Sequence, residues 1–311
     1  MLETSITLPA FAKINWGLRV IGKRADGYHE LDTILQTISL HDTIHLTASN
    51  DSKIVLSCDD RSLPAGAENL VYRAAEALRV RFAPNGGARM RLEKRIPWQA
   101  GLGGGSSNAA VTLIGLCHLW KIETSSTELS EIASTLGADV PFFLYGGTAR
   151  CRGIGSQVTP LPDGDEKFLL ILKPKASVST AQAYQALNAA SLTTLSDDTI
   201  LSGSPAPRDR DNVRANDFEP VVFRLWPEIE RSKAALTKAG ALSAMLAGSG
   251  AAVFGIFDNR EAQERAIQAI DLEPGWRVFP CTTVGRDQYR RAMGPCGGML
   301  ARVSEGMNAG A

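Results

Sequence analysis

The chain has 311 residues, 44% of them hydrophobic and 21% charged, and its 33 basic residues balance its 33 acidic residues. This length exceeds what one hydrophobic core usually supports, so two domains are expected, and the lack of a basic stripe argues against nucleic acid as a partner. The first residues do not form a secretory signal and no long apolar run occurs, which predicts no membrane span and a cytoplasmic location. Five scattered cysteines without a CxxC pair indicate reduced thiols and no zinc site.

The first third of the chain is predicted to be rich in β-structure. Residues 10–20 alternate with the period of two that is typical of a strand. The set expected to be buried is Ala10, Ala12, Ile14, Trp16, Leu18 and Val20. Lys13 and Asn15 then share the opposite, polar face. Further strands are predicted at 31–40, 43–47, 53–58 and 89–93, and a helix at 70–82.

The middle of the chain is predicted to be helical. A long helix is expected over 106–120. A second helix is expected after Ser125, which has capping-box spacing with Glu128, and it ends at Gly137. Another helical segment is expected to start at Asp139, with a proline in its first turn.

The second half of the chain mixes strands and helices, which predicts an α+β sandwich. Strands are expected at 168–172, 243–246, 251–257 and 276–281. Helices are expected at 180–187, at 216–238 with an interruption at Pro227, and at 260–270, and residues 191–211 are expected to form a loop. We divide the chain into an N-terminal domain (1–162), a C-terminal domain (163–287) and a flexible tail (288–311).

The strongest functional signal is the segment from Pro97 to Ala110, in which four glycines precede a Ser-Ser-Asn step and a helix rich in small residues. Glycine allows positive φ and close approach to a ligand, and the free N–H groups at a helix start hold an anion. The segment therefore predicts a triphosphate site, with Ser106 or Ser107 offering a hydroxyl to a phosphate or to Mg²⁺. The alternative is a glycine-rich turn in which a serine caps the helix.

Two polar residues suit the transfer of a phosphoryl group to an alcohol. Such an enzyme positions the hydroxyl, helps to remove its proton and neutralises charge around the γ-phosphate. Asp139, at a predicted helix start, is a candidate proton acceptor. Lys13, on the polar face of the first strand, is a candidate for stabilising the developing alkoxide. Taken alone, each has a structural alternative, since Asp139 could cap a helix and Lys13 could be a solvated strand residue.

Three segments together resemble the motifs of the GHMP kinases, the superfamily of galactokinase, homoserine kinase and mevalonate kinase. They are PAFAKIN at 9–15, GLGGGSSNAA at 101–110 and LAGSG at 246–250. The resemblance implies an α+β, two-domain GHMP kinase fold. Its N-terminal domain is like ribosomal protein S5, its C-terminal domain is a ferredoxin-like α/β sandwich, and the active site lies in the cleft between them.

Other segments resemble the members of this family that act on an alcohol carrying cytidine diphosphate. They are RADGYHEL at 24–31, GADVPFF at 137–143, VST at 178–180 with Tyr184, and NDFE at 216–219. The sequence departs from the usual pattern at Trp98-Gln99-Ala100, where smaller residues are usual, and at Ser156, where an acidic residue is usual.

The resemblance also implies roles for individual residues. Asp139 is the catalytic base and Lys13 its electrostatic partner. The substrate, a small molecule, is contacted by Asn15, Tyr28, His29, Thr180 and Tyr184. ATP is contacted by Pro97, Gly101, Leu102, Gly103, Gly104, Gly105, Ser106 and Ser107, and on its adenine side by Asn69, Leu70 and Lys94. Gly248, Ser249 and Gly250 support the loop, and Ser107 is a candidate ligand of Mg²⁺.

Three rival functions are weaker. The cytidine-pocket residues argue against a GHMP kinase for homoserine or mevalonate, and the presence of both Lys13 and Asp139 argues against a catalytically inactive ligand sensor. A dinucleotide-dependent oxidoreductase would need GxGxxG, whose third glycine is missing here, and no Walker GxxxxGK[ST] sequence exists either. We expect a monomer or a homodimer.

Overall fold

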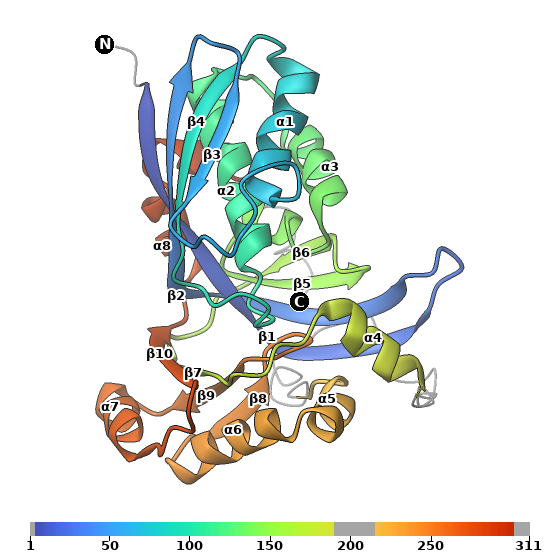
Figure 1. Ribbon diagram of the computed structural model, residues 1–311, viewed down its shortest axis with the longest axis vertical. Coiled ribbons are helices and arrows are strands. Elements are labelled where there is room, and N and C mark those ends of the chain that lie inside the picture. Colours follow the sequence, from blue (N-terminus) through green and yellow to red (C-terminus); the bar gives the residue numbers. More distant parts are fainter. Residues whose placement is uncertain (1–3, 190–214, 302–311) are drawn as a thin grey trace, which may run out of the picture.

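The first sheet has six strands and lies in the N-terminal half of the computed structural model, which describes residues 4–189 and 215–301 (Figure 1). Its strand order is β3-β4-β2-β5-β6, and β1 pairs antiparallel with β2. The strands are β1 (Ser5–Lys23), β2 (His29–Ser49), β3 (Ile54–Cys58), β4 (Gly87–Glu93), β5 (Thr148–Gly153) and β6 (Gln157–Leu161). Helices α1 (Leu70–Phe82), α2 (Gly104–Leu119) and α3 (Ser126–Leu136) cover one face of this sheet (Figure 1).

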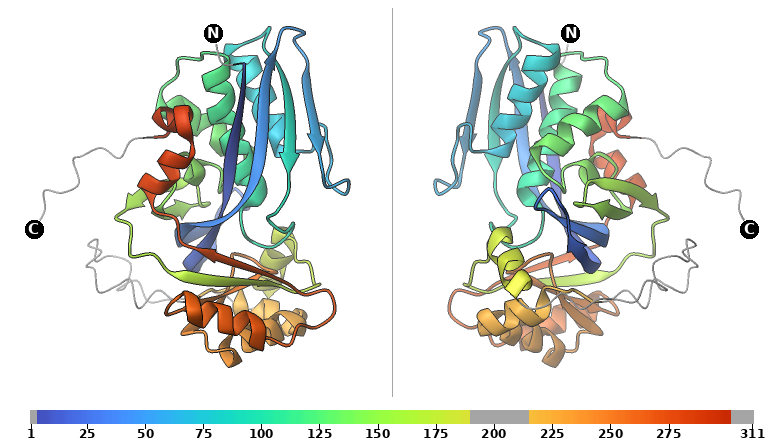
Figure 2. Two further views of the ribbon diagram at one scale, coloured as in Figure 1. Left: turned by 90° about the vertical axis from the view of Figure 1, so that its left-hand side faces the viewer. Right: turned by 90° about the vertical axis from the view of Figure 1, so that its right-hand side faces the viewer.

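The second sheet has four strands in the order β10-β7-β9-β8. The strands are β7 (Phe168–Lys173), β8 (Ser243–Leu246), β9 (Val253–Phe257) and β10 (Arg277–Thr282). Helices α6 (Pro227–Lys238) and α7 (Arg260–Ala269) pack on its outer face (Figure 2). Helix α5 (Glu219–Leu225) contacts α6, and α4 (Thr180–Ala189) contacts α5 and lies near the β1–β2 hairpin (Figure 1). The inner face meets the first sheet through a buried apolar cluster in which Ile14 and Ile38 lie among residues such as Leu169 and Phe254.

The long hairpin of β1 and β2 belongs to both cores. Near its open end Leu8 and Ile44 pack in the first core, whereas Leu18 and Leu31, nearer the turn, pack in the second. The pairing register shifts three times along this hairpin, and such irregularities bend a strand pair and re-aim its side chains. The hairpin can therefore serve two cores and carry residues into the space between them.

The polar face of the first strand is buried as well. Lys13 and Asn15, which we placed together on that face, are 4% and 2% exposed. The strand lies between the helices of the first layer and the second sheet, so both of its faces are covered. Lys13 is therefore a buried cation. The alternative that it is a solvated strand residue is excluded.

The predicted helices and their ends largely agree with the structure. Ser125 caps α3 and forms the full capping box with Glu128, and Gly137 follows the helix as its C-cap. The segment after it is a short 3₁₀ helix, η1 (Pro141–Leu144), whose N-cap is Val140. Asp139 thus precedes the cap by one residue, and the expected start of a helix at Asp139 is wrong. The loop expected at 191–211 lies outside the described residues.

The expected flexible tail is also wrong for its first part. Residues Arg286–Ala292 form α8, and Gly294–Met299 form a 3₁₀ helix, η4. Tyr289 is fully buried in the first core, and its hydroxyl donates a 2.7 Å hydrogen bond to the backbone carbonyl of Phe143. The segment is too short for helical periodicity to show, which is why it was missed. The rest of the expected tail, from residue 302, lies outside the described residues.

The two sheets divide near the domain boundary that we placed between residues 162 and 163. The first sheet ends at Leu161 and the second begins at Phe168. The division into domains itself stays a prediction. Among residues 4–189 and 215–301, no helix is both long and apolar enough to cross a membrane.

Candidate active site

A cleft of about 960 Å³ lies where the hairpin, the start of α2 and the second layer meet. It gathers most of the residues predicted from the sequence. Those that line it are Lys13, Asn15, Tyr28, His29, Leu70, Lys94, Pro97, Gly101, Leu102, Gly103, Gly104, Gly105, Ser106, Asp139, Thr180, Tyr184, Gly248 and Ser249. Asn69, Ser107 and Gly250 do not line it.

The glycine loop leads directly into α2. Gly103 is the N-cap of this helix in the left-handed conformation, with φ of 70°, and no side chain caps the helix start. The first N–H groups of a helix have no partner within the helix, and the helix dipole adds positive potential there. The start of α2 lines the cleft, and a helix start of this kind can hold an anion.

The turn between β8 and β9 holds the glycine loop in place. The Ala251 and Ala252 N–H groups donate to the carbonyls of Gln99 and Ala100, at 3.2 and 3.1 Å. Contact is so close that a Cβ added to Gly101 would lie 1.9 Å from the carbonyl oxygen of Ala247. Only glycine fits at position 101, because any side chain there would keep the glycine loop and the turn at 246–250 apart.

Lys13 and Asp139 form the charged centre of the cleft. The Lys13 Nζ lies 3.4 Å from Asp139 Oδ2 and donates a 2.9 Å hydrogen bond to Asn15 Oδ1. Asn15 in turn donates to Thr33 Oγ1 at 2.8 Å, so a buried chain of hydrogen bonds fixes the lysine. The Lys13 side chain is 5% exposed and that of Asp139 is 34% exposed. The carboxylate can therefore meet a ligand in the cleft while the cation remains behind it.

Aromatic rings line the end of the cleft away from the glycine loop. The rings of His29 and Tyr184 stack at 4.7 Å with an interplanar angle of 23°, and Phe218 packs edge-on against Tyr184 at 4.9 Å. Tyr28 also lines the cleft and is 62% exposed. Burial raises the pKa of the Tyr184 hydroxyl above its ordinary value, with a smaller contribution from the negative charge of Asp139. These rings offer stacking surfaces to a planar base.

Of two further residues predicted to contact a ligand, Thr180 lines the cleft and Asn69 does not. The Thr180 Oγ1 lies 3.2 Å from Ser249 Oγ, which joins α4 to the β8–β9 turn. Asn69 is the N-cap of α1, where its Oδ1 accepts from Val71 N at 2.9 Å. Asn69 therefore has a structural role in the described structure, next to Leu70, which does line the cleft.

Sequence reasoning missed Asp42, a fully buried carboxylate on β2. It forms an ion pair with Lys94 and accepts hydrogen bonds from the backbone N–H groups of Arg95 and Ile96, at 2.7 and 2.8 Å. It thus fixes the segment that leads into the glycine loop and holds Lys94 at the rim of the cleft. Asp42 interrupts an apolar strand, but nothing in the sequence pairs it with residue 94.

The site suits Mg²⁺ only if phosphates supply most of its ligands. Protein-bound Mg²⁺ commonly uses one or two carboxylates together with substrate phosphates. In the described part of the chain, no group of three or more His, Cys, Asp or Glu could hold a metal. The cleft offers the Asp139 carboxylate and the Ser106 hydroxyl. In the same part of the chain, the buried Ser107 Oγ has no hydrogen-bond partner, as befits a hydroxyl at a phosphate loop.

The class of protein follows from comparison with known families and structures. Residues 69–147 match the family described as GHMP kinases N terminal domain, and residues 202–274 match the one described as GHMP kinases C terminal. A crystal structure of homoserine kinase from Cytophaga hutchinsonii shares the fold, with a TM-score of 0.69 and 20% identity over 93% of this chain and 97% of that one. Fold and site together define a GHMP kinase, and this confirms the resemblance seen in the motifs.

More similar relatives define the particular family. The 4-diphosphocytidyl-2-C-methyl-D-erythritol kinase of Solibacter usitatus is 43% identical over 91% of this chain and 90% of that protein. The enzyme of that name from Pelotomaculum thermopropionicum is 42% identical over 83% of this chain and 91% of that protein. A crystal structure of 4-(cytidine 5'-diphospho)-2C-methyl-D-erythritol kinase matches with a TM-score of 0.73 and 34% identity, over 90% of this chain and 100% of that chain. The chain belongs to the 4-diphosphocytidyl-2-C-methyl-D-erythritol kinases.

Proposed function

We propose that this protein transfers the γ-phosphoryl group of ATP to the 2-hydroxyl of 4-diphosphocytidyl-2-C-methyl-D-erythritol, giving the 2-phosphate and ADP. The reaction belongs to the non-mevalonate route to isoprenoid precursors, and we place it in the cytoplasm. The observation that carries the proposal is that the Lys13–Asp139 pair shares one cleft with the glycine loop at the start of α2. The names of the relatives supply the identity of the alcohol.

The phosphates of ATP are proposed to bind at the start of α2. The free backbone N–H groups of the first turn, at Gly104–Ser106, lie at the cleft there, with the helix dipole behind them. The Ser106 hydroxyl in the cleft adds a donor, and the buried Ser107 hydroxyl, which has no hydrogen-bond partner among the described residues, is the proposed Mg²⁺ ligand. Mg²⁺, when bound, neutralises charge on the phosphates. Leu70 and Lys94 lie further along the cleft, where we propose that the adenine binds.

The chemistry is proposed to centre on Asp139 and Lys13. Asp139 accepts the proton of the substrate hydroxyl as its oxygen attacks the γ-phosphorus. The new O–P bond forms while the bond from the γ-phosphorus to its bridging oxygen breaks, and the electron pair leaves with ADP. The Lys13 ammonium, 3.4 Å from the carboxylate, stabilises the negative charge that develops on the attacking oxygen and on the transferred group.

Substrate selection is proposed to use the aromatic end of the cleft. Tyr28 and Tyr184 provide faces on which a cytosine can stack, and His29 provides a ring nitrogen for the edge of the base. Asn15 and Thr180 are polar contacts nearer the reacting hydroxyl. The two nucleotides thus bind on opposite sides of the transferred phosphate.

A substrate panel tests the proposal directly. The purified protein is incubated with ATP, Mg²⁺ and each of three alcohols: the cytidine-diphosphate methylerythritol, homoserine and mevalonate. We expect ³¹P NMR to show a new phosphomonoester signal with the first compound, and a rate of its formation lower by ~10²–10⁴ with Asp139→Asn under the same conditions. Much faster turnover of homoserine or mevalonate would show that the assigned substrate is wrong.

A further inference from the structure

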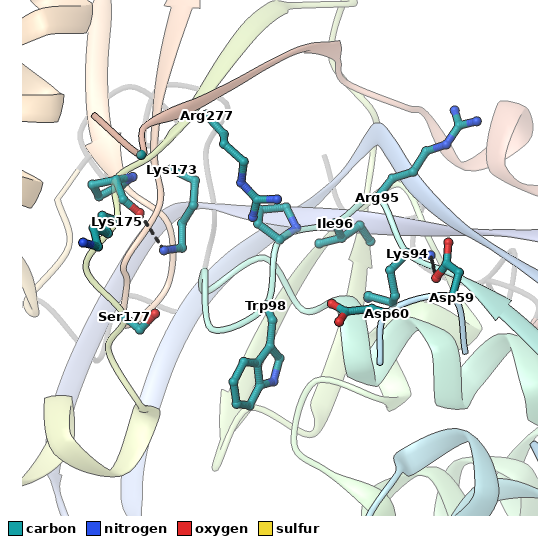
Figure 3. A pocket seen from close by; sticks show the side chains of 13 residues that line it. Asp59, Asp60, Lys94, Arg95, Ile96, Trp98, Lys173, Lys175, Ser177 and Arg277 are labelled. Atoms are coloured by element: carbon teal, nitrogen blue, oxygen red, sulfur yellow. Dashed lines mark hydrogen bonds between the residues drawn. The ribbon is translucent and has the colours of Figure 1, made fainter. Parts of the chain in front are cut away.

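A second pocket of about 450 Å³ lies beside the active-site cleft and is lined by cations from both layers (Figure 3). The two spaces share one wall, formed by Lys94, Pro97 and Trp98. The charged residues that line the pocket are Lys94, Arg95, Lys173, Lys175 and Arg277, with Asp59 and Asp60. We propose that this pocket is a second anion site, which binds a phosphate-bearing small molecule independently of the phosphoryl-transfer site.

The central observation is a pair of like charges on neighbouring strands. Lys173, the last residue of β7, lies directly opposite Arg277, the first residue of β10. Like charges at directly opposed positions destabilise a sheet unless something compensates them. In Figure 3, Arg277 reaches across the pocket toward Ile96 and Trp98, with Lys173 beside it. An anion held in the pocket would neutralise both side chains.

Lys173 is a buried cation without a counter-ion. It is 5% exposed, and its Nζ donates to the backbone carbonyls of Pro174 and Ala176, at 2.8 and 2.6 Å. Burial lowers its pKa to about 8, and the charge of Arg277 lowers it further, whereas Glu228 raises it. A buried ammonium that carries a charge at neutral pH is costly without a compensating charge. The two carbonyl contacts supply only part of that compensation.

The nearby carboxylates are already engaged elsewhere. Within residues 4–189 and 215–301, Lys173, Lys175 and Arg277 form no ion pair. Glu228 accepts from the backbone N–H groups of Lys175 and Ala176 and from the indole of Trp276. Asp60 accepts from its neighbour Ser62, and Asp59 from the backbone N–H of Lys94. Apart from Lys94, which pairs with Asp42, four cations line the pocket against the two carboxylates of Asp59 and Asp60, so the pocket keeps a net positive charge.

Trp98 suggests which phosphates would fit. This side chain is 59% exposed at the rim of the pocket, and an exposed indole at a cationic site can stack on a planar ring. A nucleoside monophosphate would use the cations and the indole together, whereas free inorganic phosphate would use the cations alone. Both share the phosphate chemistry that the proposal requires.

The test separates this pocket from the active site by filling the latter first. The full-length protein is titrated with the non-hydrolysable ATP analogue AMP-PNP and Mg²⁺ in a calorimeter, which tests the proposed function on its own. The loaded enzyme is then titrated with inorganic phosphate and, separately, with AMP. We expect one additional site, with affinity reduced about tenfold or more in Arg277→Gln and in Lys173→Met, because each loses a charge-assisted contact.

A matched variant controls for overall charge. Arg265→Gln removes the same charge from an exposed position on α7, in the same layer but outside the pocket, and is expected to bind as the wild type does. If Trp98→Ala weakens AMP but not phosphate, the ligand is a nucleotide; if it weakens neither, the ligand is phosphate itself. Two results would overturn the proposal. One is that the wild type loaded with AMP-PNP binds neither phosphate nor AMP, and the other is that Arg277→Gln binds them with unchanged affinity.

Discussion

Replacing Tyr184 with alanine should weaken the binding of the cytidine substrate and leave ATP unaffected. Base–aromatic stacking contributes roughly 1–3 kcal/mol per base, and tenfold in affinity corresponds to about 1.4 kcal/mol, so KM should rise by about 5- to 140-fold. The structure favours the upper part of this range. Tyr184 also packs against His29 at 4.7 Å, and its loss would release the ring that we assign to the edge of the base.

The assay compares steady-state kinetics for both substrates in matched variants. Tyr184→Phe keeps the ring and its edge contact with Phe218, so its KM should stay within about twofold of the wild type, since stacking uses the ring rather than the hydroxyl. His29→Ala should instead reduce discrimination between the cytidine and uridine forms of the substrate, because hydrogen bonds to the base edge carry that choice. Thermal melting of each variant separates these effects from loss of the fold.

One result would refute this reasoning. If Tyr184→Ala leaves the KM for the cytidine substrate unchanged and raises that for ATP, the two nucleotides lie in the cleft the other way round. The assignment of the aromatic end as the cytidine pocket would then be wrong, even though the catalytic pair could remain correct.

Four further predictions concern other parts of the molecule. Asp139→Asn should lower kcat by ~10²–10⁴ with both ligands still bound by calorimetry, and near wild-type turnover would show that no protein base is needed. Gly101→Ala should abolish ATP binding in calorimetry, because its Cβ would lie 1.9 Å from a backbone oxygen, whereas Gly164→Ala, outside the cleft and with no atom within 4 Å of the added Cβ, should bind normally. At pH 8 a thiol reagent should react first with the half-buried Cys58, because the other four thiols are buried, and Cys58→Ser should remove that fast phase. Tyr289→Phe should lower the unfolding free energy by about 1 kcal/mol in denaturant titrations, since it leaves a buried carbonyl without its donor; an unchanged midpoint would argue against that bond.

Local signals in the sequence predicted those parts of the fold that depend on neighbouring residues. The capping box at Ser125 and the glycine loop before α2 were both found, because caps and glycine turns act over three or four residues. The helix that contains Tyr289 was missed because its stability comes from burial against the first core, a long-range contact that leaves no periodic pattern. The burial of Lys13 also depends on long-range packing, so the strand pattern left a solvated position open as an alternative.

The candidate site shows the same limit. The residue types alone indicated a proton acceptor at Asp139 and a stabilising cation at Lys13. The family resemblance predicted that these two residues act as a pair. Asp42 could not be found in this way, because a single aspartate in a strand has no marker for a partner 52 residues away. The like-charged pair of Lys173 and Arg277 was equally hidden, since only the register of β7 and β10 makes them neighbours.

The hairpin of β1 and β2 fixes Lys13 relative to both layers. The N–H of Lys13 donates to the carbonyl of Leu102 in the glycine loop, at 2.9 Å. Five residues further on, the N–H of Leu18 donates to Ala215 at 2.9 Å, and the N–H of Val20 donates to the carboxylate of Asp217 at 2.8 Å. All three donors belong to β1, and their acceptors lie in different layers. If the two layers moved apart as rigid bodies, some of these bonds would break. The cleft is therefore expected to keep its width, and adjustment to the substrate is expected at the exposed hairpin turn instead.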